Sequence, residues 1–207
     1  MTEKELIKSS KKFTEIDFKK YQHKFKELVE KGQNPKTLFI GCCDSRVLPN
    51  LITNTGPGDL FVIRNIGNFV PPFSPDHEFH STAAGIEYAV SVLEVEDIVV
   101  CGHSHCGAIS SLYKPKQDKP ELIHTYKWLE LGKEVKDFVS KLELDKETSI
   151  KKTEKYSTLF QLTNLLTYPA VKQRVEEGKL FLNAWYYELE SGKIEYFNFE
   201  KAAFEEL

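Results

Sequence analysis

Apolar residues along this chain follow two different spacings, and the first stretch has the spacing of a helix. Before Gly32, large apolar side chains recur every three or four positions, at Phe18, Tyr21, Phe25, Leu28 and Val29. This pattern predicts an amphipathic helix that ends at Gly32. Thr14 and Asp17 are the candidates for its N-terminal cap. The aromatic face is expected to pack on the body of the protein or on a partner subunit.

Short, continuously apolar runs follow, and they predict buried strands. They cover residues 37–41, 60–63, 97–102 and 180–189. Segments with helical spacing lie between these runs. They cover residues 80–93, a stretch that begins near residue 105, and the regions around 128–142 and 156–166. Strands that alternate with helices predict a parallel sheet with right-handed crossovers. A turn at Ser191 and Gly192 leads into 194–199, which is expected to pair antiparallel at one edge.

The predicted fold class is therefore α/β. We expect three layers, with a mostly parallel central sheet of four strands plus an antiparallel edge strand, flanked by helices and preceded by an N-terminal helical arm. A length of 207 residues suits a single domain.

Composition and charge narrow the possible functions. With 41% hydrophobic and 29% charged residues, the chain has the balance of a globular protein that buries a core without disulfides. A net charge of -3 argues against a nucleic-acid partner. The first residues do not resemble a secretory signal, and no apolar run approaches about 20 residues. We therefore expect no membrane partner and a cytoplasmic location, in which cysteines stay reduced.

Two predicted strand ends carry side chains that can bind a metal. Cys42 and Asp44 follow the first strand and face the same side of an extended chain, whereas Cys43 faces away. Arg46 lies on that side too, and its guanidinium can hold the Asp44 carboxylate with two charge-assisted hydrogen bonds.

The second strand end supplies an imidazole and a thiolate, from His103 and Cys106. Because ligands gather beyond the carboxyl ends of parallel strands, these two side chains can converge with Cys42. Two thiolates and one imidazole favour zinc over magnesium or calcium. A structural zinc site is usually closed by four Cys or His ligands, so the nearby carboxylate predicts an exchangeable fourth position. Cys43 and Cys101 are interpreted as small core residues.

Together these segments resemble the motifs of the β-class carbonic anhydrases, in the same order and spacing. The matching motifs are Cys42-x-Asp44-Ser45-Arg46, Arg64-Asn65-x-Gly67-Asn68 and His103-x-x-Cys106-Gly107. The resemblance implies zinc-dependent, reversible hydration of carbon dioxide to bicarbonate and a proton by zinc-bound hydroxide.

The resemblance also implies roles for these residues. One Zn²⁺ per chain is bound by Cys42, His103 and Cys106. Asp44 and Arg46 match the family's catalytic dyad, which orients the hydroxide. In an inactive form of the family, the aspartate becomes the fourth zinc ligand.

A substrate pocket and an oligomer follow from the same resemblance. Gln33, nine positions before the first ligand, matches the plant-like subclass, whose glutamine donates a hydrogen bond to bicarbonate. Phe61, Ile66 and Tyr88 match its apolar pocket, although composition alone would make them ordinary core residues. The backbone N–H of Gly107 is expected to face the substrate. Some pocket residues come from the partner subunit, so a homodimer is the minimal unit and a homotetramer is the favoured assembly.

On this interpretation residues 1–207 form one carbonic-anhydrase-like domain with four parts. They are an N-terminal arm (1–32), a zinc and catalytic core (33–113), a helical block (114–178) and C-terminal strands (179–207).

Other interpretations stay open at this point. The same ligands could serve hydrolysis of carbon disulfide or carbonyl sulfide. A zinc-stabilised binding or nucleic-acid module is opposed by the net acidity and by the Asp44–Arg46 pair. A non-catalytic bicarbonate pocket known from another subclass is not expected, because Phe39 replaces its tryptophan, although Arg64 and Tyr187 are retained. The proton acceptor is not assigned among His23, His77, His80, His105 and His124.

Overall fold

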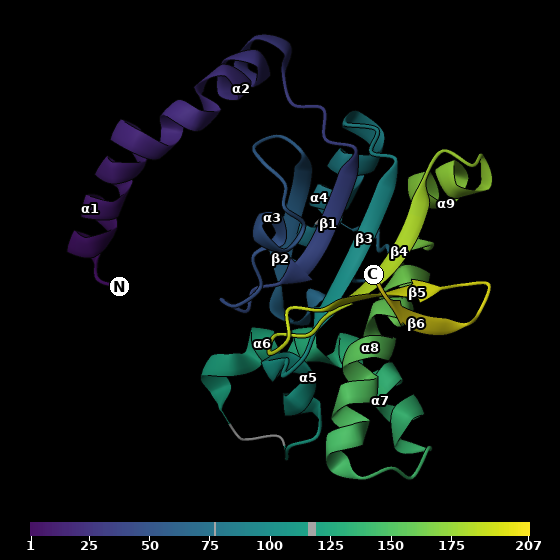
Figure 1. The fold of residues 1–207 in the computed structure, drawn as a ribbon. Helices are drawn as coiled ribbons and strands as arrows, with labels where there is room; N and C mark the ends of the chain where they lie inside the picture. Colours follow the sequence, from purple (N-terminus) through teal and green to yellow (C-terminus); the bar gives the residue numbers. More distant parts are fainter. Residues whose placement is uncertain (77, 116–118) are drawn as a thin grey trace.

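A sheet of six strands lies at the centre of the part of the chain that the computed structural model describes, residues 1–76, 78–115 and 119–207. Its order is β2-β1-β3-β4-β5-β6 (Figure 1). The strands are β1 (Thr37–Cys42), β2 (Leu60–Asn65), β3 (Asp97–His103), β4 (Phe181–Tyr187), β5 (Ile194–Asn198) and β6 (Ala203–Glu206). The first four are parallel, and β5 and β6 run antiparallel at one edge. The predicted α/β class is confirmed, and β6 adds a second antiparallel strand.

The helices flank this sheet (Figure 1). None of the described helices is both long enough and apolar enough to cross a membrane. Beyond the N-terminal arm, the helices and helical turns are α3 (Pro49–Ile52), η2 (Ile66–Asn68), α4 (Ser81–Glu87), η3 (Tyr88–Val92), α5 (Gly107–Leu112), η4 (Pro120–Leu122), α6 (Ile123–Leu129), η5 (Glu130–Gly132), α7 (Lys133–Ser140), α8 (Lys146–Leu165) and α9 (Pro169–Glu176). His77, one of the candidate proton acceptors, lies outside the described residues.

The N-terminal arm starts earlier than its apolar pattern predicts. Helix α1 (Glu3–Lys12), the turn η1 (Phe13–Asp17) and α2 (Phe18–Lys31) follow one another and extend away from the sheet (Figure 1). Thr2 caps α1 in a capping box with Glu5, whose backbone N–H lies 3.4 Å from the threonine hydroxyl. The predicted caps were therefore wrong: Asp17 makes no side-chain cap, and the Thr14 hydroxyl donates to the Ser10 carbonyl.

Alternating residues of the parallel strands divide the core into two faces. One face of β1 and β3, including Leu38, Ile40 and Val100, packs against buried residues of α4, η3, α8 and α9. The other face carries Phe39 and the fully buried Cys101, with half-buried aromatic residues of β4 beside them. The interpretation of Cys101 as a core residue is confirmed.

Helix α8 passes so close to β3 that only glycine fits at one position of the strand. A Cβ on Gly102 would lie 2.9 Å from the backbone oxygen of Glu154 and 2.9 Å from the Cγ2 atom of Thr158. Backbone atoms cannot yield as a flexible side chain can, so the helix would have to move. The absence of a side chain at Gly102 therefore sets the distance between α8 and the strand that ends at His103.

We expect Gly102→Ala to lower the free energy of unfolding by about 1–3 kcal/mol, the usual cost of an overpacked core. Gly107→Ala is the matched control, since its added Cβ would meet no atom within 4 Å among the described residues outside its own helical turn. Urea denaturation followed by circular dichroism measures both. Equal stabilities of the two variants would contradict this account of the packing.

Candidate metal centre

The parallel pairing of β1 with β3 brings the two chemically rich strand ends together. Gly41 pairs with Cys101 in this register, so Cys42 and His103 both follow at the same edge of the sheet. Cys106 lies after a tight turn, in which His105 has a φ of 57°. The ligand atoms of Cys42, His103 and Cys106 all lie within 4.8 Å of one another, and all three residues are buried.

The His103 imidazole has the protonation pattern of a metal ligand. Its Nδ1 atom lies 2.9 Å from the Ser104 carbonyl oxygen, which can only accept a hydrogen bond, so Nδ1 carries the proton. Its Nε2 atom is buried and has no hydrogen-bond partner among the residues that the structure describes. Buried polar atoms are rarely left unpaired, and a cation among the three side chains would satisfy this one.

The two thiols also fit a shared cation. The contact with Cys106 lowers the pKa of the Cys42 thiol, and the same contact raises the pKa of the Cys106 thiol. Two thiolates this close repel each other, so both can ionise only with a cation between them. Two thiols and one imidazole, with their ligand atoms within 4.8 Å of one another, are a donor set that would fit one zinc ion. The Gly67 N–H, 3.4 Å from the Cys42 sulfur, stabilises its thiolate as well.

Asp44 lies beside this cluster and is held by Arg46. The Nε and Nη2 atoms of Arg46 donate to the two carboxylate oxygens at 2.9 and 2.7 Å, and its backbone N–H donates to Oδ1 at 3.0 Å. These hydrogen bonds keep the pKa of Asp44 well below its usual range. The Asp44 carboxylate is therefore ionised and can act only as an acceptor.

Arg64 is a residue whose role the sequence did not reveal, although it stands in the second motif. From β2 its Nε atom donates to the Cys42 carbonyl at 2.9 Å, and its Nη2 atom donates to the Asp44 carbonyl at 2.7 Å. Both donors are thus used to hold the main chain between the first ligand and the dyad. Nothing in the sequence except the motif itself could have indicated this contact.

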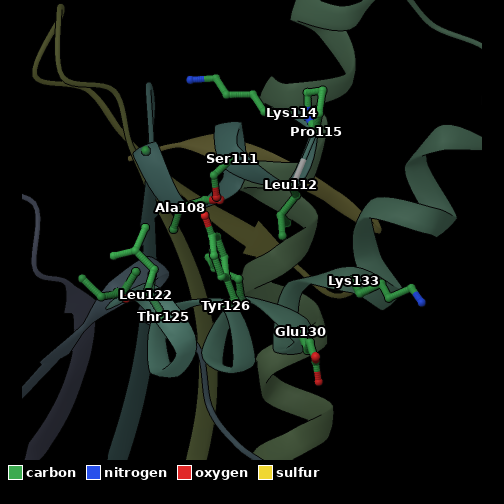
Figure 2. Close-up of a pocket in the computed structure, with 13 residues that line it drawn as sticks. Ala108, Ser111, Leu112, Lys114, Pro115, Leu122, Thr125, Tyr126, Glu130 and Lys133 are labelled. Atoms are coloured by element: carbon green, nitrogen blue, oxygen red, sulfur yellow. The ribbon is translucent and has the colours of Figure 1, made fainter. Parts of the chain in front are cut away.

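Two of the predicted substrate residues lie next to the metal ligands. Ile66 and Gly107 line a cavity of about 540 Å³. Figure 2 shows the cavity between side chains of α5, such as Ser111, and side chains of α6, such as Tyr126. Gly107 opens α5, so its N–H has no acceptor within that helix. The indole N–H of Trp128 donates to the Ile66 carbonyl at 2.7 Å and holds the cavity wall.

The other three predicted substrate residues lie towards the opposite end of the sheet of the same chain. The rings of Phe61 and Tyr88 stack with their centroids 5.8 Å apart. Phe61 pairs with Leu38, four residues before Cys42, which is about 13 Å along a strand. Gln33 is exposed and precedes β1 altogether. One protomer therefore does not bring Gln33, Phe61 and Tyr88 to its own metal ligands.

The interpretation of Cys43 as a core residue was wrong, because the structure exposes it. Cys43 follows the last residue of β1, and none of the described elements of the chain buries it there. His105 also points away: its ring Nε2 lies 3.4 Å from a carboxylate oxygen of Glu190.

The sequence and the fold agree with those of known proteins. The carbonic anhydrase family model matches residues 37–194. The carbonic anhydrase of Synechococcus elongatus is 41% identical over 195 residues, covering 92% of this chain and 70% of the relative. The solved structure of the β-carbonic anhydrase CcaA superposes with a TM-score of 0.92 and 39% identity, over 99% of this chain and 91% of that one. The chain belongs to the β-class carbonic anhydrases.

A second solved β-carbonic anhydrase, from the ascomycete Sordaria macrospora, is described as tetrameric. It has a TM-score of 0.80 and 29% identity, over 92% of this chain and 94% of that one. The family assignment from three short motifs is thus confirmed across nearly the whole fold. The plant-like subclass and the four-part division of the domain stay predictions.

We expect Cys42→Ala to reduce zinc from about one ion per chain to almost none, since two ligands hold zinc poorly. Cys43→Ala is the matched control and should keep its zinc. Elemental analysis after gel filtration measures the metal, and circular dichroism checks that both variants are folded. Full zinc content in a folded Cys42→Ala variant would rule out this site.

Proposed function

We propose that this chain is a zinc-dependent carbonic anhydrase that hydrates carbon dioxide reversibly to bicarbonate and a proton. The observation that carries the proposal is the buried cluster of Cys42, His103 and Cys106, with an arginine-held carboxylate beside it. These three side chains would hold zinc, which would supply a Lewis acid that lowers the pKa of water.

Asp44 orients the nucleophile in this proposal. Because its carboxylate is ionised, Asp44 accepts a hydrogen bond from the nucleophile and so directs a lone pair of the nucleophile towards the carbon atom of the substrate. Arg46 occupies both carboxylate oxygens, which supports a state in which Asp44 stays off the metal. The exchange of Asp44 between arginine and zinc would switch the enzyme off.

The substrate binds against apolar and N–H groups. Ile66 offers apolar surface beside the ligands, and the N–H of Gly107, which has no acceptor within its own helix, can stabilise the carboxylate oxygens that develop during hydration. The reduced thiols that zinc requires support a cytoplasmic location. Carbonyl sulfide and carbon disulfide are the alternative substrates, since they have the same linear shape and need the same ligands.

A homodimer completes the site in this proposal. Gln33, Phe61 and Tyr88 lie too far from the metal ligands of their own chain, and a second copy can present them. The exposed apolar residues of the arm support such an assembly; they include Leu6, Ile7, Phe13 and Ile16, each at least 45% exposed. The tetrameric relative from Sordaria macrospora supports a tetramer built from such dimers.

Stopped-flow hydration of carbon dioxide by the zinc-loaded protein at alkaline pH is the direct test. Asp44→Ala should lower kcat by about 100-fold or more, the range of an acid–base group, with zinc content unchanged. Asp137→Ala removes an exposed carboxylate elsewhere and should change nothing. Absence of turnover in the wild type, with zinc bound, would reject the proposal. Turnover of carbonyl sulfide without turnover of carbon dioxide would make carbonyl sulfide the substrate instead.

Mixed dimers test whether the site is shared. An Asp44→Ala chain and a Gln33→Ala chain, co-expressed with different tags, form dimers in which one site keeps both residues. We expect about half of the wild-type activity per mixed dimer, since one of two symmetry-related sites is intact. If one chain supplies both residues, the mixed dimer should be no more active than the mean of the two single-variant dimers.

A further inference from the structure

One peptide group connects the metal ligands to the dyad. It joins His105 to Cys106. Its carbonyl oxygen, from His105, accepts a hydrogen bond from Nη2 of Arg46 at 3.2 Å. Its N–H, from Cys106, donates to Oε1 of Glu154 at 2.8 Å. The orientation of this single plane therefore affects both the ligand Cys106 and the arginine that holds Asp44.

This peptide lies in a turn that needs external support. His105 has a φ of 57°, in the left-handed region, which costs a non-glycine residue about 1 kcal/mol or more. Such a conformation persists only where neighbouring groups hold it. The Arg46 and Glu154 contacts act on opposite ends of the peptide dipole, so each favours the same orientation.

Glu154 is an unusual residue for its position. It lies in the middle of α8 and is only 3% exposed. Its second oxygen, Oε2, accepts from the hydroxyl of Tyr186, which is fully buried, at 3.0 Å. No ion pair found among the described residues includes it. A buried carboxyl without a cation is costly, and both of its oxygens are used to bind fixed donors.

We infer that Glu154 is a positioning residue for the reaction: it fixes the plane of the 105–106 peptide and thereby places the Cys106 thiolate and anchors Arg46. The inference rests on the proposed function, whose metal ligands and dyad it connects. Without the Glu154 acceptor the peptide can rotate. The Cys106 sulfur then leaves its place beside Cys42, and Arg46 loses the carbonyl that holds it next to Asp44.

Two substitutions separate the orientation of the peptide from simple loss of stability. Glu154→Met keeps the length of the side chain and removes both acceptors. Glu154→Gln keeps an acceptor for the Cys106 N–H, and its amide can donate to the Tyr186 oxygen. Tyr168→Phe is a matched control, because it removes another buried tyrosine's hydrogen bond, to the Pro71 carbonyl at 3.0 Å, away from the site.

The readouts are the rate of zinc release to a chelator and the sulfur-to-metal charge-transfer absorption of the cobalt(II) protein. Glu154→Met should release zinc about 10-fold to 100-fold faster, because the loss of a hydrogen bond that supports a metal ligand typically has an effect of this size. The same substitution should alter the charge-transfer band of the cobalt(II) protein. Glu154→Gln should restore the wild-type release rate and band. Tyr168→Phe should unfold more easily but release zinc at the wild-type rate. If Glu154→Met does not fold, Glu154→Leu takes its place.

The rate of zinc release also tests whether Glu154 and Arg46 act on the same peptide. The fold-increase in this rate in the double variant Glu154→Met with Arg46→Lys should be smaller than the product of the fold-increases in the two single variants. A fold-increase in the double variant equal to that product would overturn the inference, and so would a Glu154→Gln variant that releases zinc as fast as Glu154→Met. Zinc held equally well by Glu154→Met and wild type would overturn it too, whereas a wild type that binds no metal would first overturn the proposed function.

Discussion

The parallel pairing of β1 with β3 is the constraint on which the site depends. Cys42 and His103 are 61 positions apart in the chain, and only this register makes them neighbours. Apolar alternation sets the register, because Leu38 and Ile40 must face the helices on one side of the sheet. A slip of one residue would turn these side chains to the other face and would reverse the direction of Cys42 as well.

Helix α8 holds the loops that this pairing brings together. Its buried face is largely polar: Glu154 binds the Cys106 N–H, and Gln161 and Asn164 bind the N–H and carbonyl of Val70. The segment around Val70 follows Gly67, whose N–H contacts the Cys42 sulfur. One helix thus supplies acceptors and donors to irregular backbone on both sides of the metal ligands, where neighbouring strands cannot.

This polar helix also marks the limit of what the sequence could predict. The strands β1 to β5 and the cluster of Cys42, His103 and Cys106 were predictable, because apolar runs and residue spacing are local. The buried face of α8 was not, since Glu154 and Gln161 interrupt the apolar period that indicates a core helix. The prediction that Cys43 is buried failed for a related reason. Alternation along a strand predicts the direction of a side chain but not whether another element covers it. The distance between Gln33 and the ligands depends on the tertiary structure, which no local sequence pattern reveals.

The contacts around Arg46 explain how a rigid site could still contain a switch. Its partner Asp44 is only 17% exposed, and the His105 carbonyl that also binds Arg46 belongs to a backbone fixed from behind by Glu154. The Arg46 side chain itself is 53% exposed, so water and salt compete for its hydrogen bonds. The fixed groups therefore define where the arginine and the carboxylate lie, and the exposed arginine is the member of the pair that can leave. Because Arg46 also donates to the His105 carbonyl, its departure would free Asp44 and would at the same time remove one of the two contacts that hold the 105–106 peptide next to Cys106.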